Sequence, residues 1–389
     1  MPKRVIYPAL ICYGLSLLGA ALAVQDQRTV LLSPASTATS DVDPPHKPFA
    51  RQLVGFAINL HHTDTLDAHR HAIDELKALG FNSVLVITPA FQTNGASVTV
   101  RLETGPGRGP SRQQLVALLG YARDRGMQTV LMPVVLFTAP RGNEWRGKIK
   151  PQRWDDWWQS YREVVDYFVG IANEAGVQIF CVGSELLTTE RQTGRWVSLI
   201  AHVRRRFQGQ LIYSTNWDHY HVPGFWPQLD AIAMNAYWNL VTETDPARPD
   251  PAALAERWRQ IREQLLAFAA EQGRPVLLTE VGYPSLPWAL QKPWNYVAPS
   301  DTAADAAAQA MGYAAFLEAW GDLIRPPTHA HAIQPVAPTH PAGVFFYEWD
   351  VYANGPEHDT RYGVQGKPAL DLLRQWLRDT APRPGAGRW

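Results

Sequence analysis

The sequence predicts an α/β protein with a single (β/α)₈ barrel, a TIM barrel, preceded by a signal peptide and a flexible spacer. Eight short apolar runs alternate with amphipathic stretches between residues 52 and 380. The runs are apolar almost throughout, which is typical of parallel strands covered by helices. Eight such units in a chain of 389 residues fit one closed barrel.

The first residues are predicted to form a signal peptide, residues 1–23. Lys3 and Arg4 are basic, residues 5–20 are largely apolar, and Ala21-Leu22-Ala23 matches a small-x-small cleavage site. The apolar stretch is near the lower length limit for a membrane span, so an uncleaved signal would act as a single anchor. In either case we expect an exported domain, periplasmic or extracellular, and attached to the envelope if the signal stays.

Residues 24–50 are rich in Ser, Thr, Asp and Pro without an apolar period, and we expect a flexible linker. The catalytic domain is expected over 51–381, followed by a disordered tail, 382–389. Cys12 lies in the signal, so the mature chain would keep only Cys181 and could form no internal disulfide.

Helices are predicted between most of the strands of the barrel. The strands are expected at 54–60, 83–89, 129–137, 178–186, 210–217, 231–238, 275–282 and 343–350. The helices are expected at 65–79, 111–125, 153–174, 192–207, 251–271, 301–320 and 368–378. The fifth connection, 218–230, is too short and Pro-rich for a full helix.

A doubly wound open sheet is the alternative architecture. It would carry a glycine-rich nucleotide turn after an early strand, and the segment INLHHTDT (58–65) has none. The segment TGPGRGPS (104–111) lacks the Lys-Ser/Thr ending of a phosphate loop, which indicates a surface loop.

Composition argues against highly charged partners. Lys plus Arg and Asp plus Glu both number 36, which disfavours nucleic acid or an anionic membrane as the main partner. Fifteen Trp and fourteen Tyr exceed the needs of a core, and rings with an apolar face and a polar edge suit a neutral ligand such as a sugar.

Two carboxylates are expected at the mouth of the barrel, where the active sites of such folds lie. Glu185 ends the fourth strand and Glu280 ends the seventh. Strict alternation would put Cys181 and Gly183 on one face with Glu185, and Val276 and Leu278 on one face with Glu280. A single Glu could merely cap a helix or pair with an arginine, but two at matching depth favour catalysis.

Paired carboxylates of this kind perform glycoside hydrolysis. One donates a proton to the leaving oxygen, and the other attacks the anomeric carbon or activates water. A short separation of about 5–5.5 Å implies retention, and about 6.5–9.5 Å implies inversion.

The motifs WRGKIKP (145–151), CVGSELL (181–187), LIYSTNWD (211–218), AIAMNAYW (231–238), LLTEVGYPS (277–285) and FFYEWD (345–350) resemble glycoside hydrolase family 113, a family of retaining β-mannanases with a (β/α)₈ barrel. The resemblance implies Glu185 as acid/base and Glu280 as nucleophile. For that mechanism we expect Glu185 to be protonated and Glu280 to be ionised when substrate arrives. It implies Tyr237 as the hydrogen-bond donor to the nucleophile and Trp349 as the floor beneath the reacting sugar. Ser184 stands where many members of the wider clan have Asn. This leaves open which residue binds the sugar 2-hydroxyl, and therefore whether the substrate sugar is mannose or glucose.

Further residues at strand ends or in loops after strands are candidate substrate contacts. These candidates are Asn59, His61, Trp145, Arg146, Asn216 and Trp217. We expect a monomer that binds a polysaccharide or oligosaccharide and uses no metal or organic cofactor.

Two other functions remain open at this level. One is a carbohydrate-binding barrel that has lost catalysis. The presence of glutamate at both candidate catalytic positions, 185 and 280, argues against it. The other is a metal-dependent barrel hydrolase, which requires a His-x-His motif of metal ligands at the end of the first strand. The adjacent pair His61 and His62 lacks that spacing, and His69 and His71 fall in a helix.

Overall fold

A computed structural model describes residues 46–61, 63–242, 249–324, 335–353 and 358–380. The expected signal peptide, most of the expected linker and the expected C-terminal tail lie outside these residues. None of the helices described is both long and apolar enough to cross a membrane.

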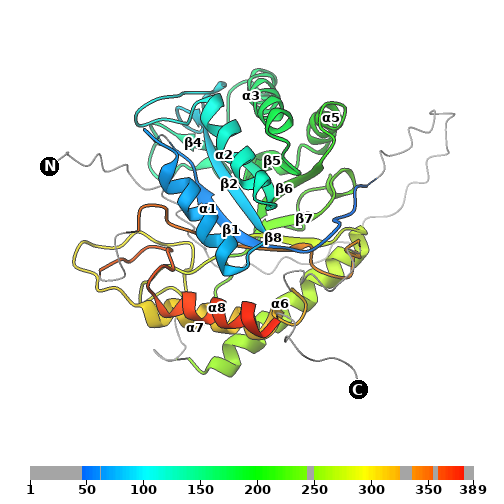
Figure 1. Cartoon of the computed structure of the whole chain (residues 1–389). Helices are drawn as coiled ribbons and strands as arrows, with labels where there is room; N and C mark the ends of the chain where they lie inside the picture. The colour runs from blue at the N-terminus through cyan, green and yellow to red at the C-terminus, as the bar shows by residue number, and fades with distance from the viewer. Residues whose placement is uncertain (1–45, 62, 243–248, 325–334, 354–357, 381–389) are drawn as a thin grey trace.

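Eight parallel strands close into a barrel, as the sequence predicts (Figure 1). The barrel strands are β1 (Leu53–Asn59), β2 (Ser83–Gln92), β4 (Gln128–Phe137), β5 (Ile179–Ser184), β6 (Gln210–Asn216), β7 (Ile232–Asn235), β8 (Val276–Val281) and β9 (Gly343–Phe346). Each strand pairs with the next, and β9 returns to pair with β1, which closes the ring. A further short strand, β3 (Val100–Arg101), adds to β2 in antiparallel orientation and stands outside the ring.

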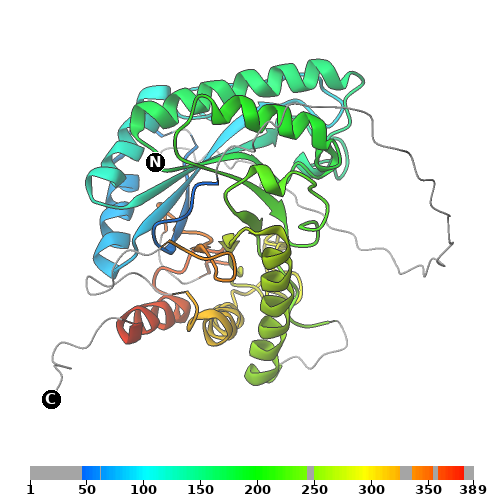
Figure 2. The same ribbon diagram turned by 90° about the vertical axis from the view of Figure 1, so that its right-hand side faces the viewer.

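Helices surround the strands on the outside, with α1, α2, α3 and α5 in the upper half of Figure 1 and α6, α7 and α8 in the lower half. Their bounds are α1 (Asp67–Leu79), α2 (Arg112–Asp124), α3 (Trp154–Ala175), α4 (Leu187–Glu190), α5 (Thr193–Arg204), α6 (Pro251–Gln272), α7 (Ala306–Trp320) and α8 (Pro368–Thr380). The orthogonal view shows the same wrapping (Figure 2). The connection from β6 to β7 contains only a short 3₁₀ turn, η2 (Trp226–Gln228), as expected from its prolines.

The start of α7 differs from the predicted helix, which was expected to begin at residue 301. Asp305 caps the helix instead, and its side chain accepts a hydrogen bond from the Ala308 N–H at 2.9 Å. A side chain that satisfies a free N–H of the first turn fixes where a helix begins. Residues 282–305 are therefore left as a long loop between β8 and α7.

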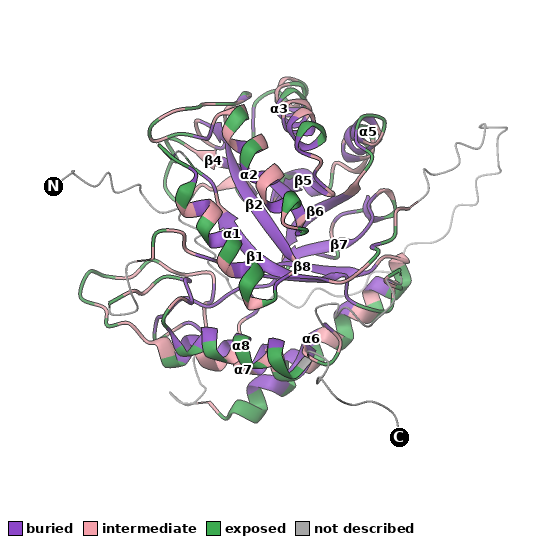
Figure 3. Cartoon of the chain, viewed as in Figure 1, coloured by how far each residue is buried: buried purple, intermediate pink, exposed green. Residues whose placement is uncertain are grey.

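Two layers of apolar side chains hold the barrel together. The inner layer contains only residues from strands and adjoining segments, such as Ala57, Ile87 and Leu277. The outer layer joins the other faces of the strands to the helices, with Val54 and Leu278 among its members. Figure 3 shows buried strands at the centre and helices that expose only their outer faces. Cys181 belongs to the inner layer, where its thiol is buried and forms no disulfide.

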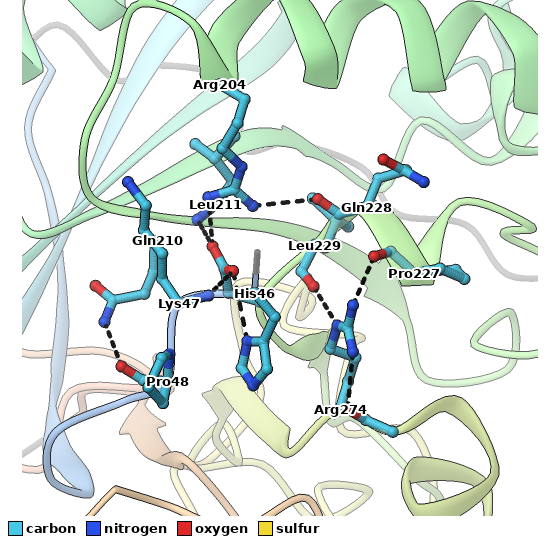
Figure 4. Close-up of polar contacts among 12 residues, drawn as sticks. His46, Lys47, Pro48, Arg204, Gln210, Leu211, Pro227, Gln228, Leu229 and Arg274 are labelled. Atoms are coloured by element: carbon cyan, nitrogen blue, oxygen red, sulfur yellow. Dashed lines mark hydrogen bonds and ion pairs between the residues drawn. The ribbon is translucent and has the colours of Figure 1, made fainter. Parts of the chain in front are cut away.

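Residues 46–50 close the bottom of the barrel, although their composition predicts a flexible linker. Phe49 is 2% exposed and belongs to the inner apolar layer. The Lys47 N–H donates to buried Asp230 at 2.7 Å, and Arg204 pairs with the same carboxylate at 2.7 Å (Figure 4). The packed part of the chain therefore includes residues before 51, held by the buried Phe49 ring and by hydrogen bonds of the backbone.

Candidate active site

A cavity of about 380 Å³ opens at the C-terminal ends of the barrel strands. Both candidate carboxylates line it. The other predicted residues along its wall are Asn59, His61, Trp145, Arg146, Asn216, Trp217 and Tyr237. The structure thus brings together every predicted site residue except Ser184 and Trp349.

Glu185 reaches the cavity through an irregularity at the end of β5. The register of β5 against β6 shifts between Cys181 and Ser184. A Cβ added to Gly183 would lie 2.8 Å from the Trp196 ring, in the outer layer, so Gly183 does not share the inner face with Cys181 as predicted. Glu185 itself has a φ of 51°, in the left-handed region, and its N–H donates to the Ser214 carbonyl at 2.8 Å.

Glu280 also depends on a break in strand alternation. Val276 and Leu278 lie in the outer layer and Leu277 in the inner one, so the predicted shared face of Val276, Leu278 and Glu280 is wrong. The register of β8 against β7 shifts before Glu280, which pairs with Asn235. This shift turns the Glu280 side chain into the cavity, where it is 6% exposed.

Each carboxylate has a strong hydrogen-bond partner. Arg146 Nη2 donates to Glu185 Oε2 at 2.5 Å, and both side chains are largely buried. Tyr237 donates its hydroxyl hydrogen to Glu280 Oε2 at 2.6 Å, as the family resemblance implies. Charge-assisted hydrogen bonds of this length fix the orientation of both partners.

Burial and a neighbouring charge shift the pKa of Glu280. Burial raises the pKa of the Glu280 carboxyl to about 8, and the negative charge of Glu185 adds to the rise. The hydrogen bond from Tyr237 and the positive charge of Arg146 oppose it without cancelling it. The surroundings of Glu280 therefore favour its protonated form more than water would.

A third carboxylate, Glu348, lies behind the cavity wall. Asn59 donates its side-chain N–H to Glu348 and to the Tyr347 hydroxyl, the latter at 3.2 Å. Burial, with the charge of Asp350, raises the pKa of Glu348 to about 7. Because its amide is held on two sides, Asn59 presents a fixed polar group to the cavity.

Aromatic rings form much of the remaining wall. Trp217 stacks on Trp294 with ring centroids 5.7 Å apart and an interplanar angle of 21°. Several wall residues were not singled out from the sequence as substrate contacts: Ile87, Val134, Leu136, Asp218, Asn239, Trp294, Tyr296, Tyr347 and Tyr362. The PWNY segment after β8 carries Trp294 and Tyr296, and its place in a loop after a strand was the signal that could have identified them.

Trp349 and Ser184 do not occupy the expected positions. Trp349 packs edge-on against Phe56 in the outer layer, at 5.2 Å between centroids, and Tyr347 lines the cavity instead. Tyr347 is two residues earlier, and the strand ends at Phe346, so alternation no longer determines which side chain faces inward. The Ser184 hydroxyl is buried, has no hydrogen-bond partner and is not part of the cavity wall.

Histidines are distributed rather than clustered. His61 lines the cavity, and buried His69 contacts the Asn59 carbonyl through Nε2 at 3.3 Å. Within the described residues, no group of three or more His, Cys, Asp or Glu side chains is placed to hold a metal ion.

The family model of Glycoside Hydrolase Family 113 matches residues 59–323. Among solved structures, the chain is similar to a family 113 β-mannanase from Alicyclobacillus acidocaldarius in complex with ManMIm, at 24% identity and a TM-score of 0.69, covering 85% of this chain and 98% of that one. A second family 113 β-1,4-mannanase matches at 21% identity and a TM-score of 0.69, covering 84% and 99% of the two chains.

An endo-1,4-β-D-mannanase from Thermotoga petrophila RKU-1 shares the fold at 11% identity and a TM-score of 0.52, covering 84% of this chain and 99% of that one. No curated protein matches the sequence. At these identities the structural similarities establish the barrel fold, and the family model carries the assignment.

Proposed function

The chain belongs to glycoside hydrolase family 113 and is a glycoside hydrolase, and from this premise we propose that it cleaves β-mannan by a retaining, double-displacement mechanism. Glu185 is the acid/base and Glu280 the nucleophile in this proposal. The observation that carries it is the burial of both carboxylates in one aromatic-walled cavity, close enough for the charge of one to raise the pKa of the other. The endo-acting mode and the mannan substrate rest on the similar β-mannanases.

In the first step an oxygen of Glu280 bonds to the anomeric carbon while the glycosidic C–O bond breaks. Glu185 gives its proton to the leaving oxygen. In the second step water attacks the anomeric carbon, Glu185 takes the water proton, and the bond to Glu280 breaks. Both carboxyls return to their starting states.

These two steps require a proton on Glu185 and a negative charge on Glu280. Bound substrate favours these protonation states in two ways. The leaving oxygen accepts a hydrogen bond from protonated Glu185, and the positive charge that develops at the anomeric carbon stabilises ionised Glu280. Tyr237 favours the same outcome, because its hydrogen bond lowers the pKa of Glu280.

The sugar in the reacting position would meet aromatic faces and amide groups. Trp217, Trp294 and Tyr347 offer surfaces for stacking, and Asn59 and Asn216 offer hydrogen bonds. Since the Ser184 hydroxyl lies outside the wall, we assign the 2-hydroxyl to one of these amides rather than to Ser184.

The proposal extends to location and assembly. Residues 1–23 carry the charge, apolar run and cleavage pattern of an export signal, so the enzyme would act in the periplasm or outside the cell as a monomer. Cell fractionation of the full chain, with envelope and soluble fractions assayed separately, tests export and anchoring.

The experiment for activity compares wild type, Glu185→Gln and Glu280→Gln on β-mannan, other soluble polysaccharides and aryl glycosides. We expect cleavage of β-mannan, retained anomeric configuration by NMR, and a loss of about 10³-fold or more in kcat on mannan for each variant. Glu174→Gln is the matched control, because Glu174 forms an exposed ion pair with Arg112. Full activity of Glu280→Gln would refute the nucleophile assignment, and a wild type that binds glycans without cleaving them would favour the binding-barrel alternative.

A further inference from the structure

Five residues after Glu185, a carboxylate that the proposed reaction does not use is fully buried. Glu190 ends the short helix α4 and is 0% exposed. Burial of a charged carboxylate is costly unless hydrogen bonds compensate for the lost water. The groups that compensate Glu190 show which parts of the site it contacts.

Three donors surround the Glu190 carboxylate, and all come from β6 or the loop that follows it. Tyr213 and Thr215 donate their hydroxyl hydrogens to Oε1 at 2.9 and 2.8 Å. His219 Nδ1 lies 3.0 Å from Oε2. The backbone N–H of His219 donates to the Asn216 carbonyl. Glu190 is thereby connected to the loop after β6, which carries cavity residues.

The Tyr213 hydroxyl extends the network back to the acid/base. While it donates to Glu190, it accepts a hydrogen bond from the Leu186 N–H at 2.9 Å. Leu186 follows Glu185 directly, and Glu185 has the left-handed φ of 51°. A non-glycine residue keeps this conformation only when its surroundings impose it.

We propose that Glu190 is a positioning residue for Glu185, acting through the Tyr213 hydroxyl on the Leu186 N–H. The carboxylate orients the hydroxyl so that its lone pair faces Leu186, and this fixes the turn that aims Glu185 at the leaving oxygen. The inference rests on the proposed role of Glu185 as acid/base. Misplacement of a catalytic group by about 1 Å can cost about 10²-fold in rate.

The test uses two substrates that differ in their need for an acid. A β-mannooligosaccharide needs a proton on its leaving oxygen, whereas a 2,4-dinitrophenyl β-mannoside has a leaving group that departs without one. Glu185→Gln calibrates the comparison: kcat/KM should fall on the oligosaccharide and be largely spared on the dinitrophenyl substrate. Failure of this calibration would refute the role of Glu185 and would be distinguishable from failure of the positioning role.

Given that calibration, Tyr213→Phe should lose about 10- to 100-fold in kcat/KM on the oligosaccharide and spare the dinitrophenyl substrate. Glu190→Gln should show a smaller loss with the same selectivity, because the amide keeps one acceptor oxygen but places a donor against His219. Glu174→Gln, which removes a charge from an exposed ion pair outside this network, is the control and should match wild type.

Equal losses on both substrates in both folded variants would overturn the proposal, because they would indicate general damage rather than a misplaced acid. Wild-type kcat/KM on both substrates would overturn it as well. Thermal unfolding of each variant establishes that the protein is folded. Should Glu190→Gln fail to fold, Tyr213→Phe still decides, since it leaves the Thr215 and His219 contacts of Glu190 in place.

Discussion

Removal of the Tyr237 hydroxyl should shift the pH dependence of the enzyme in a defined direction. The hydroxyl donates to Glu280 Oε2 at 2.6 Å, and this hydrogen bond lowers a pKa that burial raises to about 8. Tyr237→Phe deletes the donor and keeps the ring. The pKa of Glu280 should therefore rise further, and the nucleophile should ionise only at higher pH.

The size of the effect follows from the strength of the bond. A hydrogen bond to a charged group contributes about 1.5–3 kcal/mol. One pKa unit corresponds to about 1.4 kcal/mol, so the acid limb of kcat/KM should move up by about 1–2 pH units. Well below that limb, activity should fall by about 10- to 100-fold, and above it the variant should approach wild type.

The assay is kcat/KM on a mannooligosaccharide from pH 4 to pH 10, with Tyr121→Phe as the control. Tyr121 donates to Asp74 at 2.7 Å on the outer surface, so its variant loses the same kind of bond far from the cavity. The limb reports the coupled pair of carboxyls rather than Glu280 alone. An acid limb that stays at the wild-type pH in Tyr237→Phe would refute the assignment of Glu280 as the ionised nucleophile.

Two further changes test other charges of the structure. Arg146→Met should also move the acid limb of kcat/KM to higher pH, because the charge of Arg146 lowers the pKa of Glu280. Arg146→Lys keeps the charge, and its acid limb should stay near that of wild type. An unmoved limb in Arg146→Met would contradict this role of the Arg146 charge. Asp230→Asn should lower the free energy of unfolding by about 3 kcal/mol, since buried Arg204 loses its charged partner. Denaturant unfolding measures this loss, and a change below about 1 kcal/mol would contradict it.

Much of the fold was accessible from the sequence because it depends on local patterns. Eight apolar runs and the intervening amphipathic stretches predicted the barrel, and the structure closes β9 onto β1 as expected. Glu185 and Glu280 could be identified as candidates because a polar residue at the end of an apolar strand is visible in the sequence. Their shared cavity follows from the parallel order of the strands.

Side-chain direction at the strand ends could not be predicted. Alternation is a local rule that holds while the ladder is regular, and the register shifts near Ser184 and Glu280 break it. The same limit explains why Tyr347, and not Trp349, faces the cavity. Phe49 packs under the barrel from within a segment whose composition resembled a linker.

The sequence by itself determined the order of strands and helices, the family resemblance and the pair of carboxylates at the barrel mouth. Only the tertiary structure decided which groups surround those carboxylates. The guanidinium of Arg146 reaches Glu185 from a loop 39 residues away, and burial raises the pKa of Glu280. Charge interactions act through space and depend on solvent exclusion, so they depend on where the folded chain places its loops, which no local pattern of residues records.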